Sequence, residues 1–200
     1  MISPSADRIP LRPREGELAV RAITGMIRAK SEEGQLISRS EIIERLLDQG
    51  LIDGKEEGIQ KISETLLERA LEENGDIIKL HSAEKEPHFF SSQFMSESYA
   101  KILVKKGADP VLLVVEVVRE NSAIYPRPVP LDMFKVSPFD FTPEEIQAYL
   151  AQITKRDGCT DICQTTSSIG TVFLYSTLHL NPGYASMLAE WADVGQADNP

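Results

Sequence analysis

The order of helix stops and β-like runs is the feature that most constrains the fold of this 200-residue chain. Two helical patterns end at Asn74-Gly75 and at Asp157-Gly158, and a glycine at this position favours helix termination. Each stop is followed by two short runs rich in β-branched and aromatic residues, which is the pattern of a β-hairpin. The sequence therefore predicts two successive units in which helices precede a hairpin.

In the first half, apolar residues recur at helical spacing in three segments before the hairpin. Ser38 and Glu41 have the spacing of a capping box at the start of the second segment. The expected elements are helices over residues 15–31, 38–50 and 55–74, strands over 77–80 and 88–91, and a further helix over 96–106 that ends at Gly107.

The second half begins with Asp109-Pro110, an N-cap followed by proline in the first turn. These two residues favour a helix through Val111–Val118, although its β-branched content leaves a buried strand as the alternative. Thr142-Pro143-Glu144-Glu145 is a second N-terminal signature. The remaining expected elements are an extended connection over 125–130, a short helix over 131–136, a helix over 142–155, strands over 160–165 and 171–176, and a terminal helix over 182–191.

This order predicts an α+β, mainly helical fold with two units, each of three helices plus a β-hairpin. Such units resemble the winged-helix superfamily, a helix-turn-helix variant. Two of them in one acidic chain resemble the tandem winged-helix subunits of chromosome-segregation complexes, such as segregation and condensation protein B. The resemblance rests on the order of elements and on stop signals. The domains expected are a flexible arm (1–14), two winged-helix-like units (15–107 and 108–180), and a C-terminal helix and tail (181–200).

Charge argues against reading DNA with the third helix. The chain carries a net charge of −10. Residues 31–74 hold five Lys or Arg against twelve Asp or Glu, whereas residues 1–30 hold six against three. A helix that enters the major groove should supply cationic or amide side chains near phosphates. We therefore expect a non-enzymatic protein-interaction module, acting as a subunit or regulator of a complex or by self-association.

Two candidate functions predict two different binding surfaces. The expected partner surface contains apolar residues of the proline-rich connection and of the terminal helix: Tyr125, Phe134, Phe139, Met187 and Trp191. The alternative is a DNA-binding transcriptional regulator that uses the second unit and the basic arm, with Arg12, Arg14, Gln147, Lys155 and Arg156 as the contacts.

Catalytic chemistry has little support. The chain contains no nucleophile-elbow, P-loop or dinucleotide-binding motif, so we nominate no catalytic, cofactor-binding or small-molecule site. Cys159-x-x-x-Cys163 is more typical of small buried side chains than of a zinc site, and we expect no metal. The chain has no apolar run long enough for a membrane span, and we expect no secretory signal in its polar N-terminal segment. Two thiols without a disulfide framework suggest a cytoplasmic protein.

Overall fold

The computed structural model describes residues 13–53, 56–81 and 86–195. The chain folds as two compact units, Met1–Val104 and Lys105–Pro200. Each unit has its own helices and its own antiparallel three-stranded sheet. The α+β class predicted from the sequence is confirmed. No helix in the described ranges is long and apolar enough to cross a membrane.

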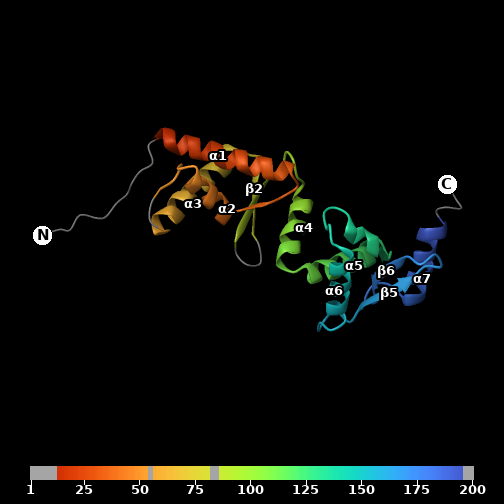
Figure 1. Ribbon diagram of the computed structural model, residues 1–200. Coiled ribbons are helices and arrows are strands. Elements are labelled where there is room, and N and C mark those ends of the chain that lie inside the picture. Colours follow the sequence, from red (N-terminus) through yellow and green to blue (C-terminus); the bar gives the residue numbers. More distant parts are fainter. Residues whose placement is uncertain (1–12, 54–55, 82–85, 196–200) are drawn as a thin grey trace. The chain divides into compact units, whose positions relative to one another are not determined.

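The first unit contains the long helix α1 (Pro13–Glu32), which contacts α3 (Glu56–Glu73) and the central strand β3 (Pro87–Ser91) of the sheet (Figure 1). Its sheet has the order β1-β3-β2, and β3 pairs antiparallel with both neighbours. The elements are α1 (Pro13–Glu32), β1 (Ile37–Ser38), α2 (Arg39–Asp48), α3 (Glu56–Glu73), β2 (Ile77–His81), β3 (Pro87–Ser91) and α4 (Glu97–Ala108).

The core of the first unit lies between α1, α2, α3 and the sheet. Its buried side chains come from every one of these elements, so burial of one apolar face per helix drives the packing. Ser38 caps α2 by accepting from the backbone N–H of Glu41 at 3.2 Å. The fully buried members include Ile23, Ile27, Ile37, Ile42, Leu46, Ala70 and Phe89.

The second unit repeats the order of the first. Its sheet has the order β4-β6-β5, again with the last strand in the centre. The elements are α5 (Pro110–Ile124), β4 (Val129–Pro130), the 3₁₀ helix η1 (Leu131–Lys135), α6 (Pro143–Ile153), β5 (Ile162–Thr166), β6 (Val172–Ser176), α7 (Pro182–Glu190) and the π-helical turn η2 (Trp191–Gly195).

The caps predicted from the sequence determine where the helices of the second unit begin. Asp109 accepts from the backbone N–H of Leu112 at 2.9 Å, and α5 follows with Pro110 in its first turn. The helix interpretation of Val111–Val118 is thereby confirmed over the strand alternative. Thr142 and Glu145 form a reciprocal capping box at the start of α6.

The structure also corrects several expectations. Each hairpin is joined by a third strand of two residues, β1 or β4, which the sequence analysis did not predict. The helix expected to stop at Gly107 continues to Ala108. Leu18 on α1 is exposed despite its apolar side chain, whereas its neighbours Ala19 and Val20 lie on the buried face of the helix.

Candidate interaction site

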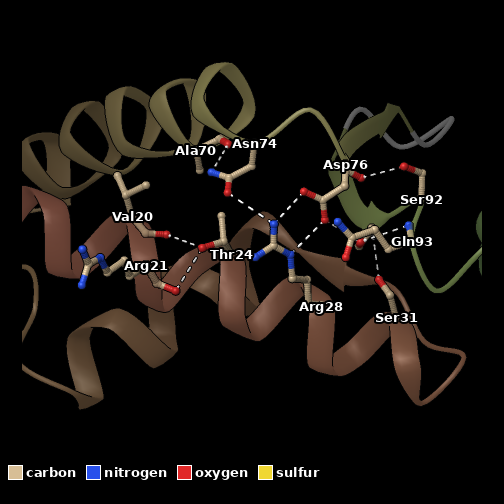
Figure 2. Close-up of polar contacts among 11 residues, drawn as sticks. Val20, Arg21, Thr24, Arg28, Ser31, Ala70, Asn74, Asp76, Ser92 and Gln93 are labelled. Carbon is tan, nitrogen blue, oxygen red and sulfur yellow. Dashed lines mark hydrogen bonds and ion pairs between the residues drawn. The ribbon is translucent and has the colours of Figure 1, made fainter.

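An Arg–Asp–Ser cluster fastens the first helix of the first unit to its hairpin (Figure 2). Arg28 on α1 donates from Nε and Nη2 to the two carboxylate oxygens of Asp76 at 2.9 and 2.7 Å. Ser91 Oγ donates to the same carboxylate at 2.7 Å. Charge-assisted pairs of this bidentate kind fix orientation as well as adding stability. The cluster therefore joins α1, the start of β2 and the end of β3.

Ser31 and Ser92 add hydrogen bonds between this cluster and backbone groups. Ser31 Oγ accepts from the backbone N–H of Ser91 at 2.8 Å and donates to the carbonyl of Ile27 at 2.8 Å. The backbone N–H of Ser92 donates to the carbonyl of Asp76 at 2.8 Å. Polar groups at the end of β3 thus find their hydrogen-bond partners within the protein.

The second unit contains the same cluster built from other residues. Arg119 on α5 donates to both carboxylate oxygens of Asp161 at 2.5 and 3.0 Å. Ser176 Oγ donates to that carboxylate at 2.6 Å, and Ser122 Oγ accepts from the backbone N–H of Ser176 at 3.0 Å. The two units therefore share side-chain contacts as well as an order of elements.

These matching contacts reveal a repeat at residue level, beyond the repeated order of elements that the sequence predicts. The pattern Arg-x-x-Ser occurs at 28–31 and 119–122, and Asp-Ile occurs at 76–77 and 161–162. The ends of the hairpins read FSSQFMSESYA (residues 90–100) and YSTLHLNPGYA (residues 175–185). Self-similarity of this kind between two stretches of one sequence is the signature of a duplication.

The clusters lower the pKa of their carboxyl groups. Hydrogen bonds from Arg28 and Ser91 to Asp76, opposed by desolvation, hold its pKa at about 2 rather than 3.8. Arg119 and Ser176 likewise hold the pKa of Asp161 at about 2. The side chains of Asp76 and Asp161 are only 10% and 8% exposed, so solvent screens these pairs weakly.

We expect each unit to lose about 2 kcal/mol of stability as the pH falls from about 4 to about 2. In this window the unfolded carboxyl groups bind protons that the folded ones do not, so stability rises with pH. The measurement is urea unfolding at a series of pH values. Asp161→Asn removes the titrating group and should flatten the pH dependence of the second unit. An unchanged slope in this variant would mean that Asp161 is not the group responsible.

A groove of about 370 Å³ lies in the second unit beside its edge strand β4. Phe173 on β6 lines it but is only 2% exposed, whereas Trp191 at the end of α7 supplies exposed aromatic surface. Trp191 is 60% exposed and is the only tryptophan of the chain. The remaining lining residues are Asn121, Arg127, Pro128, Val129, Pro130, Met133, Leu188, Ala192 and Asp193.

Helix α7 presents an exposed apolar face next to this groove. Tyr184, Met187 and Trp191 are exposed and follow the i, i+3, i+7 spacing of one helix face. Glu190 holds the helix against the tip of the β5–β6 hairpin, because its carboxylate accepts from the backbone N–H of Ser168 at 2.8 Å and from the Ser168 hydroxyl. The apolar face is therefore presented by an anchored helix.

Of the residues predicted for a partner surface, three are exposed and two are buried. Tyr125 is exposed, and the centroid of its ring lies 5.2 Å from the guanidinium carbon of Arg127. Met187 lies on α7 and Trp191 at its end. Phe134 and Phe139 are 1% and 6% exposed, with ring centroids 5.1 Å apart. The prediction that these two phenylalanines lie on the surface is wrong, because η1 and the turn after it place them in the core.

The residues predicted to contact nucleic acid are spread over both units. Arg14 is exposed on α1, whereas Gln147, Lys155 and Arg156 are exposed on or just after α6. Arg156 forms an ion pair with Asp109 at 2.7 Å, so it also supports the N-cap of α5. Arg12 lies outside the described residues.

The described ranges contain no group of three His, Cys, Asp or Glu suited to hold an ion. Cys159 is buried and Cys163 half-buried, and both are free thiols. Tyr175 and Cys163 instead pack within the small apolar cluster around Leu180 and Ala185.

Comparison with known proteins finds relatives but no structural precedent. The YdhW C-terminal domain family matches residues 108–197, which include the groove and α7. The chain is 30% identical over 177 residues to "Uncharacterized protein YdhW" of Escherichia coli (strain K12), a match that covers 87% of this chain and 78% of that protein. No solved structure matches the chain.

Proposed function

The chain belongs to the YdhW family, and we propose that it is a non-enzymatic protein-interaction module that binds a protein partner through the groove and α7 of its second unit. The observation that carries this proposal is the combination of an apolar groove with the exposed face of Tyr184, Met187 and Trp191. Aromatic residues and methionine are enriched at the centres of protein interfaces. Exposed apolar surface next to a groove is typical of a binding site.

We further infer that the two units are winged-helix-like and that the protein acts in the cytoplasm as a subunit or regulator of a complex. Both units have the order helix, strand, helix, helix, strand, strand, with η1 in place of the middle α-helix in the second. This order supports the resemblance to tandem winged-helix subunits such as segregation and condensation protein B. The two free cysteines suit a reducing compartment.

The acidic surface of α3 makes a protein partner a better candidate than DNA. Glu64, Glu68 and Glu72 are exposed along α3, on the element that would enter the major groove. Like charges facing phosphates are unfavourable at each contact.

The alternative of a DNA-binding regulator uses the exposed side chains of Gln147 and Lys155 on the second unit. The negative charges of Glu190 and Asp193 argue against this alternative. Both carboxylates contact the tip of the β5–β6 hairpin, which would serve as the wing and lie near the phosphates. Salt-sensitive binding of duplex DNA that weakens on neutralising Arg14 or Lys155 would favour this alternative.

The test replaces the exposed apolar face. We expect a Met187→Ser, Trp191→Ser double variant to lose association that the wild-type chain shows, either with itself in light scattering or with a partner in quantitative affinity enrichment. Leu178→Ser is the matched control, because Leu178 is an exposed apolar residue of the same unit that does not line the groove. A monomer at all concentrations, together with enrichment profiles that do not distinguish the double variant from the control, would refute the proposal.

A further inference from the structure

The groove of the second unit contains a cation that no carboxylate of the described residues neutralises. The other arginines of this unit, Arg119 and Arg156, form ion pairs with aspartates at 2.5 and 2.7 Å. Arg127 forms no ion pair with any described residue, and its guanidinium instead lies over the ring of Tyr125. Stacking on an aromatic ring orients a guanidinium while its N–H donors stay available.

Asp193 also lines the groove, and its carboxylate accepts a hydrogen bond from a hydroxyl. Its Oδ2 accepts from Ser167 Oγ at 2.5 Å, which joins the end of α7 to the hairpin. Arg127 is therefore available to an anion from outside. The chain carries a net charge of −10. An unneutralised cation beside apolar surface therefore gives the groove electrostatic complementarity to an anionic partner.

The edge strand beside the groove is poorly suited to pairing with another strand. Pro128 and Pro130 flank Val129 and have no backbone N–H to donate. Recognition by strand addition needs a row of backbone donors and acceptors. A partner at this groove is therefore recognised by its side chains.

We propose that the groove binds a short segment of a partner protein in which a carboxylate adjoins a large apolar side chain. The carboxylate pairs with Arg127, and the apolar side chain enters the groove against Phe173 and Trp191. The volume of about 370 Å³ falls at the small end of ligand pockets and suits one or two side chains rather than a whole domain. This inference rests on the proposed function and names the chemistry of the partner.

The experiment selects random heptapeptides from a display library on the immobilised full-length chain. The synthesised winners are then titrated into the chain while the emission of Trp191 is followed, since this single tryptophan reports on the groove directly. We expect the winners to combine Asp or Glu with a large apolar residue. We expect Arg127→Glu to weaken their binding about ten-fold or more, which is the effect of losing one charge-assisted pair.

Arg21→Glu is the matched control because it changes the net charge equally at an exposed arginine of the first unit. Binding of the winners should change less than about two-fold in this control, because Arg21 does not line the groove. Winners without a carboxylate, or winners that Arg127→Glu leaves unaffected, would overturn the charge inference and leave the proposed function standing. No enrichment above the Trp191→Ser variant would refute both. Winners that match a segment of this chain, together with a dimer in light scattering, would replace the partner with a second copy.

Discussion

Replacing Asp161 with alanine is expected to lower the free energy of unfolding of the second unit by about 3 kcal/mol. The substitution leaves the guanidinium of Arg119 without its carboxylate and removes the acceptor of the Ser176 hydroxyl. Because Arg119 is 30% exposed, water partly solvates the abandoned charge. We therefore expect the lower end of the range found for broken buried pairs.

The single tryptophan allows this loss to be assigned to one unit. Trp191 belongs to the second unit, so its fluorescence reports unfolding of that unit, whereas far-ultraviolet circular dichroism reports both. Asp161→Ala should move the fluorescence transition. The equivalent Asp76→Ala should move the circular dichroism transition and leave the fluorescence transition near its wild-type position.

An exposed ion pair provides the control for charge removal. Glu73 pairs with Arg69 on the surface of α3, and both side chains are exposed. Surface pairs of this kind contribute less than about 1 kcal/mol, so Glu73→Ala should change stability little. Glu73 and Asp76 belong to the same unit. If Asp76→Ala were no more destabilising than this control, the Arg–Asp–Ser cluster would not be a significant support of the fold.

The elements with strong local signals could be predicted from the sequence. Asp109-Pro110 and the Thr142–Glu145 box determine helix starts through contacts within three residues, so local sequence is sufficient. The strands β1 and β4 could not be predicted in this way. Each has only two residues, too few to show a period, and each forms because β3 or β6 offers an open edge.

The duplicated cluster was hidden by a change of spacing. Arg28 and Arg119 are 91 positions apart, whereas Asp76 and Asp161 are 85 apart. A single fixed period therefore misses the repeat, although its motifs are visible once the two halves are compared in separate blocks.

The groove could be anticipated only in part. Trp191 and the proline-rich connection both entered the predicted partner surface, and the structure places Trp191 and Pro128 in one lining. Neither Phe173 nor Arg127 belongs to the partner surface predicted from the sequence, although both line the groove. These residues come together through tertiary packing, which a periodic pattern does not contain.

Because Phe134 is buried, we expect it to stabilise the second unit and not to form part of a partner surface. We expect Phe134→Ala to destabilise the second unit by about 3–5 kcal/mol, through lost transfer free energy and the cavity left behind. The ring is 1% exposed and packs edge-on against Phe139 at 5.1 Å. The transition monitored by Trp191 in urea measures the loss.

Tyr125→Ala is the matched aromatic control, because Tyr125 belongs to the same predicted surface but is 62% exposed. Its removal should change stability by less than about 0.5 kcal/mol, as for other surface positions. Since Tyr125 stacks on Arg127, its loss should instead affect recognition of a carboxylate at the groove. Equal effects of the two variants on stability would place Phe134 at the surface. A large effect of Phe134→Ala with a small one of Tyr125→Ala assigns the phenylalanine to folding and the tyrosine to binding.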